Sequence, residues 1–309
     1  TSLPGTGTVS ADITPPVVAL DDVLTNDSTP ALTGTVNDPT ATVVVNVDGT
    51  DYPAVNNGDG TWTLADNTLP ALTDGPHTIT VTATDAAGNA GTDTAVVTID
   101  TSVPVVSLDD VVTNDTTPAL TGAINDPTAT VVVNVDGTDY PAVNNGDGTW
   151  TLADNTLPAL TDGPHTITVT ATDPAGNAGT DTAVVTIDTS VPVVSLDDVV
   201  TNDTTPALTG AINDPTATVV VNVDGTDYPA VNNGDGTWTL ADNTLPALID
   251  GPHTVTVTAT DPAGNTATDT ATLTIDTVPA DLIGAITIPE DLNGDGILNA
   301  DELGTDGSF

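Results

Sequence analysis

The sequence contains no lysine and no arginine, although it carries 44 acidic side chains in 309 residues and has a formal net charge of −44. Only the three histidines could ever carry a positive charge. Nucleic acids and anionic membrane surfaces bind basic residues, so both are disfavoured as partners. Because self-repulsion of this size opposes a compact state, we expect positive charge to come from outside the chain, with metal cations as the natural source.

Cysteine is also absent, which excludes disulfides and thiolate metal sites. A small extracellular domain without disulfides needs another source of stability, and a bound metal is a common one. The sequence shows no apolar run long enough to cross a membrane and no N-terminal secretion signal. The sequence also begins and ends abruptly, so we expect a fragment of a longer protein.

Glutamate is almost missing, since only Glu290 and Glu302 occur and every other acid is aspartate. Aspartate is short, favours turns and coordinates calcium from loops. The hydrophobic fraction is 38%, mainly valine, isoleucine, leucine and alanine, so the composition is not that of a disordered chain.

One unit of 88 residues occurs three times, as the matching positions Asp21, Asp109 and Asp197 show. A period of this length is that of a small independent domain and is too long for a solenoid coil. The register predicts the tail of a preceding unit at 1–12, repeats at 13–100, 101–188 and 189–276, and the start of a fourth, truncated domain at 277–309.

Each repeat is expected to be all-β. In the second, Val131, Val133 and Val135 alternate with other residues at the period of two that is typical of half-buried strands. Turn sequences separate the runs, and seven antiparallel strands are expected at 104–109, 118–124, 129–135, 139–144, 149–153, 165–172 and 180–187. This pattern predicts immunoglobulin-like β-sandwiches joined end to end in an extended rod, with Trp150 and Leu152 in the core.

The connector between repeats is short and contains proline. It runs from Asp100 to Pro104, and Pro104 fixes its own φ and biases Val103 to an extended conformation. We expect a stiff joint rather than a flexible tether.

Three motifs together resemble the bacterial Ig-like repeats of giant RTX-type adhesins, as in marine Gram-negative bacteria. They are TNDTTPALTG at 113–122, DGPHTITVTATDPAGN at 162–177 and TIDTSVP at 186–192. The resemblance covers residues 13–279. It implies a monomeric extender that is exported by type I secretion, lies outside the bacterial cell at its surface, and projects a ligand-binding tip for cell adhesion or biofilm formation.

The strand order places acids from both sides of each junction close together, where they could bind calcium through carboxylate oxygens. At the first junction Asp100 faces Asp126 and Asp173. The alternative is that these aspartates only form turns. The corresponding acids at the other junctions are Asp12 with Asp38 and Asp85, Asp188 with Asp214 and Asp261, and Asp276 with the unit that follows.

A second, weaker calcium candidate lies at the far end of each repeat. It comprises Asp109, Asp110, Asn114 and Asp115 in the second repeat, and Asp197, Asp198, Asn202 and Asp203 in the third.

The most specific motif is DLNGDGILNADE at 291–302, which matches an EF-hand calcium loop. Gly296 falls where the sharp turn of that loop needs glycine. Flanking helices are not evident, so we expect an isolated loop inside the truncated domain. The expected ligands are Asp291, Asn293, Asp295, the Ile297 carbonyl, Asn299 and Glu302, at loop positions 1, 3, 5, 7, 9 and 12.

No motif predicts catalysis, and we expect that the protein is not an enzyme. The single histidine of each repeat lacks a second histidine or a cysteine nearby and is expected to be structural. Paired carboxylates copied in three near-identical units, without aromatic sugar platforms, do not favour glycoside hydrolysis. Outward threonine rows would suit ice binding but are also ordinary strand chemistry.

The leading hypothesis is a structural spacer that is made rigid by calcium and whose partners are calcium ions and neighbouring repeats. One alternative is that the domains themselves bind glycan, ice or a partner cell. Another is an accessory region of a carbohydrate-active enzyme, which would require a catalytic domain elsewhere in the full chain.

Overall fold

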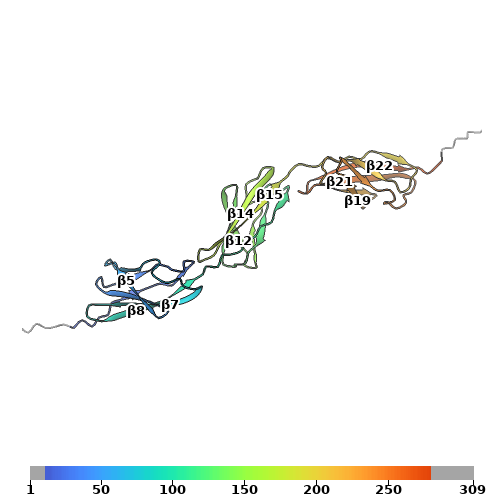
Figure 1. The fold of residues 1–309 in the computed structure, drawn as a ribbon. Helices are drawn as coiled ribbons and strands as arrows, with labels where there is room; N and C mark the ends of the chain where they lie inside the picture. Colours follow the sequence, from blue (N-terminus) through green and yellow to red (C-terminus); the bar gives the residue numbers. More distant parts are fainter. Residues whose placement is uncertain (1–10, 280–309) are drawn as a thin grey trace, which may run out of the picture. The chain divides into compact units, whose positions relative to one another are not determined.

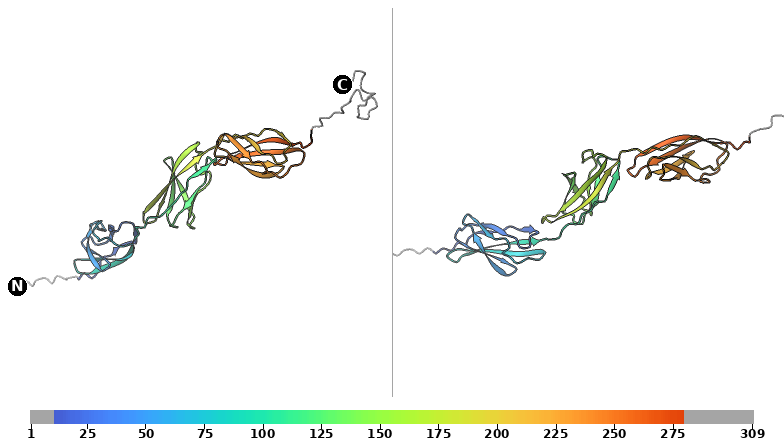
Figure 2. Two further views of the ribbon diagram at one scale, coloured as in Figure 1. Left: turned by 45° about the vertical axis from the view of Figure 1, so that its right-hand side comes forward. Right: turned by 45° about the horizontal axis from the view of Figure 1, so that its top comes forward.

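A computed structural model describes residues 11–279, in which every helix or strand element is a β-strand. Within this range no helix has the length and apolar character needed to cross a bilayer. Internal contacts divide the chain into Thr1–Ser190, which holds the first two repeats, and Val191–Phe309, which holds the third. The repeats are coloured from blue to orange in Figures 1 and 2.

The strand bounds are the following. The first repeat contains β1 (Val18–Ala19), β2 (Val23–Thr25), β3 (Leu32–Val36), β4 (Thr42–Val47), β5 (Thr50–Asn56), β6 (Thr61–Leu64), β7 (Gly75–Thr84) and β8 (Ala90–Ile99). The second contains β9 (Val111–Thr113), β10 (Leu120–Ala123), β11 (Thr130–Val135), β12 (Thr138–Asn144), β13 (Thr149–Leu152), β14 (Gly163–Thr172) and β15 (Ala178–Ile187). The third contains β16 (Val199–Thr201), β17 (Leu208–Ala211), β18 (Thr218–Val223), β19 (Thr226–Asn232), β20 (Thr237–Leu240), β21 (Gly251–Thr260) and β22 (Thr266–Ile275).

The second repeat shows how each sandwich is built. Its strands pair in the order β10-β13-β12-β11-β14-β15-β9, and β14 and β15 form a long antiparallel pair (Figure 1). Strand β12 changes partner along its length: residues 138–142 pair with β11, and residues 143–144 pair with β13. The chain therefore passes from one sheet layer to the other within β12, and the two layers enclose one hydrophobic core.

The alternation expected from the sequence is present. In β11 the side chains of Val131, Val133 and Val135 are buried, whereas Thr130 is exposed. Because β-branched side chains pack well on a pleated, half-buried surface, this run forms a strand rather than a helix.

Trp150 is the largest buried side chain of the second repeat. It is 0% exposed, and its Nε1 donates a hydrogen bond of 3.0 Å to the Ser107 carbonyl oxygen. Gly122 lies opposite it in the register of β10 and β13. A Cβ atom on Gly122 would lie 1.8 Å from the Ser107 oxygen and 2.7 Å from the indole nitrogen, so the position admits only glycine. The prediction that Trp150 and Leu152 belong to the core is confirmed.

The first expected strand, 104–109, is wrong. Only Val106 pairs there, as an isolated bridge to Ile124. Strand β9 instead forms where a loop was expected, and it pairs with β15 in parallel rather than antiparallel.

Two aspartate side chains explain this difference. The backbone N–H of Leu108 donates to Oδ2 of Asp181 at 2.9 Å, and the N–H of Val184 donates to Oδ1 of Asp110 at 2.8 Å. Carboxylates thus replace the backbone carbonyls that would otherwise accept these bonds. The segment can leave one layer and join the other without losing its hydrogen bonds.

Substitution Asp181→Ala is expected to destabilise the second repeat by about 1–3 kcal/mol, because the amide of buried Leu108 loses its acceptor. Asp181→Asn keeps a side-chain oxygen and serves as the matched control with a much smaller loss. Urea denaturation of both variants measures the difference. Equal losses would show that the Leu108 bond contributes nothing.

Candidate cation site beside the repeat connector

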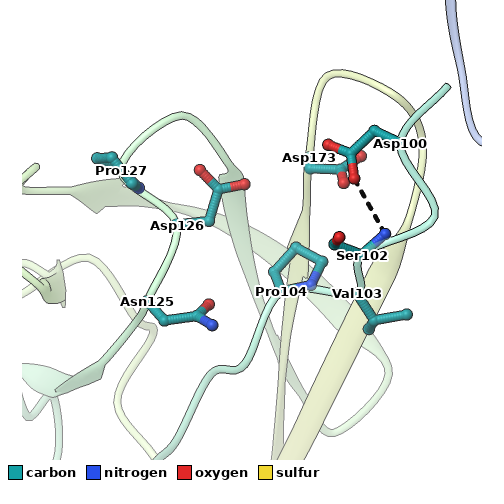
Figure 3. A pocket seen from close by; sticks show the side chains of 8 residues that line it. All are labelled: Asp100, Ser102, Val103, Pro104, Asn125, Asp126, Pro127 and Asp173. Carbon is teal, nitrogen blue, oxygen red and sulfur yellow. Dashed lines mark hydrogen bonds between the residues drawn. The ribbon is translucent and has the colours of Figure 1, made fainter. Parts of the chain in front are cut away.

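Three aspartates from separate segments line one pocket of about 200 Å³ next to the first connector (Figure 3). Asp100 follows β8, Asp126 lies between β10 and β11, and Asp173 follows β14. The remaining lining residues are Ser102, Val103, Pro104, Asn125 and Pro127.

Asp100 is fixed at the end of the first repeat by its backbone. Its N–H donates to the Thr25 carbonyl oxygen at 3.0 Å, and its Oδ1 accepts from the N–H of Ser102 at 3.0 Å (Figure 3). One carboxylate oxygen therefore caps the start of the connector, while Oδ2 receives no hydrogen bond from the described residues.

Asp126 is held by the tight turn that it forms. Its Oδ1 accepts from the N–H of Thr128 at 2.8 Å and from the hydroxyl of Thr128 at 2.7 Å. Its carbonyl oxygen accepts from Nδ2 of Asn144 at 2.8 Å, which ties this turn to the last residue of β12. The turn chemistry accounts for Oδ1 alone and leaves Oδ2 available.

Asp173 is the most buried of the three, with 6% of the residue exposed. Its Oδ1 accepts from the backbone N–H of Asn177 at 2.8 Å, and its Oδ2 accepts from Nδ2 of Asn177 at 2.8 Å. Burial raises the pKa of this carboxyl, but the hydrogen bonds from the side chain and backbone of Asn177 outweigh burial, so the pKa lies below its usual range. The group stays ionised although it is buried.

Sequence reasoning missed Asn177 as a residue of this site. Its Nδ2 also donates to the Asp100 carbonyl oxygen at 2.7 Å, so it joins the connector to the Asp173 loop. The signal that could have revealed it is an asparagine four residues after the aspartate. The same spacing recurs in the first repeat as Asp85 and Asn89.

The other repeats show the same local contacts where they are described. In the first repeat, Nδ2 of Asn89 donates to the Asp12 carbonyl oxygen at 3.1 Å, and Asp38 forms the turn with Thr40. In the third repeat, Asp214 forms the turn with Thr216, and Asp261 is 6% exposed and bonded to Asn265. The carboxylates of Asp188 and Asp276 accept from the backbone of Ser190 and Val278.

The site offers only hard oxygen ligands. Carboxylate oxygens suit calcium, magnesium or manganese, and no thiolate or free imidazole is present to favour a softer metal. Within residues 11–279, however, no group of three or more acidic, histidine or cysteine side chains lies close enough together to hold a metal ion in this conformation. The residue types fit calcium, while the carboxylates line the pocket without converging.

The far-end candidate set is divided by β9. Asp109 and Asp110 precede this strand and Asn114 and Asp115 follow it. A strand rises about 3.3 Å per residue, so roughly 13 Å of chain separates Asp110 from Asn114. Asp110 already accepts from the Val184 amide, and Asp115 forms a turn with Thr117. In the third repeat β16 separates Asp197 and Asp198 from Asn202 and Asp203 in the same way.

The EF-hand-like loop at 291–302 and the partners expected for Asp276 lie outside the described residues. The calcium ligands expected there stay predictions.

The three histidines form the only ion pairs of the described residues. In the second repeat, Nδ1 of His165 lies 2.7 Å from Oδ2 of Asp136, and Nε2 lies 2.8 Å from the Thr161 carbonyl oxygen. The bond to the Thr161 carbonyl, followed by the bond to Asp136, raises the pKa of His165 above its ordinary value. Every ring nitrogen has a protein acceptor, which is the environment of a structural histidine rather than a metal ligand.

Two sheet layers, a central buried tryptophan and seven or more strands per repeat define a tandem array of immunoglobulin-like β-sandwiches. The bacterial Ig-like domain family matches residues 17–101, 106–189 and 194–277, and the chain belongs to this family.

Among solved structures, the chain is similar to a tetra-tandem repeat in the extending region of a large adhesion protein, with 29% identity over 85% of this chain and 74% of that chain and a TM-score of 0.28. It is also similar to a structure from a 1.5-MDa bacterial ice-binding adhesin, with 25% identity over 86% of this chain and 100% of that chain and a TM-score of 0.34. A Ca2+-stabilized adhesin of an Antarctic bacterium shares 23% identity over 86% of this chain and 75% of that chain, with a TM-score of 0.36. A comparison with curated proteins finds no match.

Proposed function

We propose that this chain is a spacer in the extender region of a bacterial surface adhesin, and that calcium bound beside each connector makes it stiff. The observation that carries the proposal is the pocket of Asp100, Asp126 and Asp173, in a sequence without any lysine or arginine. The spacer lies outside the cell and has a mechanical rather than a catalytic role.

The repeats themselves support a role in setting length. The second and third differ at only a few positions, and the turns that could form a binding surface are almost unchanged between them. A domain selected for recognition of a ligand would be expected to vary in its loops, where binding residues concentrate. Three copies of one β-sandwich supply reach without a separate ligand site in each.

Electrostatics supports the calcium part of the proposal. Two carboxylates about 4 Å apart repel each other by about 1 kcal/mol in water and by about 4 kcal/mol near a protein surface. The three carboxylates do not converge in this conformation, and a divalent cation between the connector and the next sandwich would replace the repulsion that opposes their approach with attraction. The residues that would hold it are Asp100, Asp126 and Asp173, and the bound ion would join the connector to two loops of the second repeat.

The matching acids of the other repeats are proposed to serve in the same way. Asp12, Asp38 and Asp85 form the set of the first repeat, and Asp214 and Asp261 carry the same local bonds in the third.

Substitution Asp126→Asn is expected to remove one tight calcium site or to weaken it at least about tenfold, a change of about 1.4 kcal/mol in binding free energy. The asparagine keeps a side-chain oxygen for the bonds from Thr128, so the turn is retained while the charge is lost. Isothermal titration calorimetry on the full chain measures both affinity and stoichiometry.

Asp139→Asn is the matched control. Asp139 accepts from Nδ2 of Asn134 at 2.6 Å in the β11–β12 hairpin and does not line the pocket. It should bind calcium as the unmodified chain does. If Asp126→Asn has the same stoichiometry and affinity as Asp139→Asn, calcium does not bind at this connector.

A further inference from the structure

The turn before β14 contains Thr161 and Asp162, and each of these residues makes its own contact. Thr161 contacts a histidine, and Asp162 contacts the outgoing connector. On one side, the ring of His165 bridges the Asp136 carboxylate and the Thr161 carbonyl oxygen, and only 12% of its side chain is exposed. On the other side, Asp162 holds Thr189, the second residue of the outgoing connector. Oδ1 of Asp162 accepts from the N–H of Thr189 at 3.2 Å, and Oδ1 and Oδ2 each lie 2.9 Å from its hydroxyl.

The ring contacts require a cation. A carboxylate and a carbonyl oxygen are both acceptors without a proton, so both ring nitrogens must donate, and only the imidazolium form has two N–H groups. A neutral ring can satisfy one acceptor and must face the other with a lone pair. Because repulsion is stronger against the charged Asp136, the neutral ring keeps its bond to Asp136 and loses its bond to the Thr161 carbonyl oxygen.

We propose that each repeat grips its outgoing connector through a proton-linked clamp, in which the imidazolium fixes the turn and the turn aspartate fixes the first connector threonine. Thr161 and Asp162 are adjacent, so release of the Thr161 carbonyl loosens the turn that positions the Asp162 carboxylate. The clamp is closed while the histidine is protonated and loosens when the proton leaves. This inference does not depend on calcium.

The same three contacts occur in every repeat. The first repeat has Asp48–His77 at 2.7 Å, His77 to the Thr73 carbonyl at 2.8 Å, and Asp74 to the Thr101 hydroxyl at 2.9 Å. The third has Asp224–His253 at 2.5 Å, His253 to the Ile249 carbonyl at 2.8 Å, and Asp250 to the Thr277 hydroxyl at 2.7 Å. Contacts that recur in all three repeats are a property of the unit and not of one copy.

Composition leaves histidine as the only side-chain type whose ordinary pKa lies near neutral pH. The sequence has no lysine, arginine or cysteine, and aspartate, glutamate and tyrosine have ordinary pKa values far from 7 as residue types. The charged group that contacts His165 is Asp136 from the β11–β12 turn. Asp162, in the turn before β14, directs its carboxylate to Thr189. The strand on the other side of His165 presents Val185, which is uncharged.

The direction of the pH effect follows from the raised pKa of the histidines. The clamp contributes fully below the unfolded-state pKa of about 6.5. Its contribution is lost as the pH rises through the higher pKa of the folded state. Alkaline solution therefore frees the start of each connector, and mildly acidic solution holds it.

The test is an NMR titration of the full 309-residue chain between about pH 5 and pH 9, the range in which histidine alone among these side chains changes charge. The imidazole resonances report the protonation of each histidine, and the backbone amide of Thr189 reports the connector. We expect the Thr189 amide shift to change with the same midpoint as His165. We also expect exchange of this amide, corrected for intrinsic rates, to become about fivefold faster above that midpoint, as for one hydrogen bond lost.

The variant Thr189→Val tests the coupling in reverse, because linkage between two sites is reciprocal. It should lower the pKa of His165 and leave those of His77 and His253 unchanged, so the same molecule contains its controls. Thr101→Val should lower the pKa of His77 alone. The proposal is overturned if the Thr189 amide shows no change at the His165 midpoint, or if Thr189→Val leaves the titration of His165 unaltered.

Discussion

Substitution Trp150→Ala is expected to lower the free energy of unfolding of the second repeat by about 3–5 kcal/mol, the largest effect of any single side chain in that domain. The indole is 0% exposed, and it packs against Gly122 and donates to the Ser107 carbonyl oxygen. Alanine would leave a cavity and an unpaired carbonyl together. Small domains are only marginally stable, so a loss of this size leaves the repeat partly unfolded at moderate temperature.

The other two repeats are internal controls for this prediction, because Trp62 and Trp238 occupy the same position in them. Calorimetry of the full chain should show one early transition for the altered repeat and an unshifted transition for the others. Trp150→Phe, which fills part of the cavity, should give an intermediate shift. A melting profile that Trp150→Ala leaves unchanged would mean that the indole does not organise the core.

Removal of calcium is expected to have the second large effect, because the proposed function places an ion beside every connector. An ion that binds only the folded state stabilises it by about 2.7 kcal/mol at a concentration one hundred times its dissociation constant. A chelator should therefore lower the melting temperature of each calcium-binding repeat by several degrees, since about 1 kcal/mol shifts a domain of 60–100 residues by roughly 4–8 °C.

Magnesium at the same ionic strength is the control for this experiment. It demands near-octahedral geometry and gives up its water reluctantly, so it should restore much less stability than calcium. Equal restoration by magnesium would indicate general screening of the net charge of −44 rather than a calcium site.

Much of the fold follows from the sequence, because the period of two and the turn residues act locally. The alternation of residue types at 130–135 matches the alternation of buried and exposed side chains, and Trp150 is the one tryptophan of its repeat. The segment at 104–109 could not be placed in this way. Its valines suit a strand, but its path is set by the bond from the Leu108 amide to the Asp181 carboxylate. These two residues are 73 positions apart in the sequence.

The candidate site shows a similar division. The register of the repeat was enough to bring Asp100, Asp126 and Asp173 to one pocket. It could not reveal Asn177, whose amide bridges the connector and the Asp173 loop, because asparagine in a DPAGN turn is expected for its turn propensity alone. The far-end set was grouped by proximity in sequence, and a three-residue strand divides it.

Small-angle scattering of the full chain, with calcium and then with excess chelator, tests the central claim most directly. If calcium stiffens the connectors, the calcium-bound chain should behave as an extended particle, and chelation should shorten its maximum dimension and broaden its distance distribution. The variant Asp126→Asn should show part of this change even with calcium present. Identical profiles with calcium and with chelator would contradict the account, because they would mean that the connector acids do not control the stiffness of the spacer.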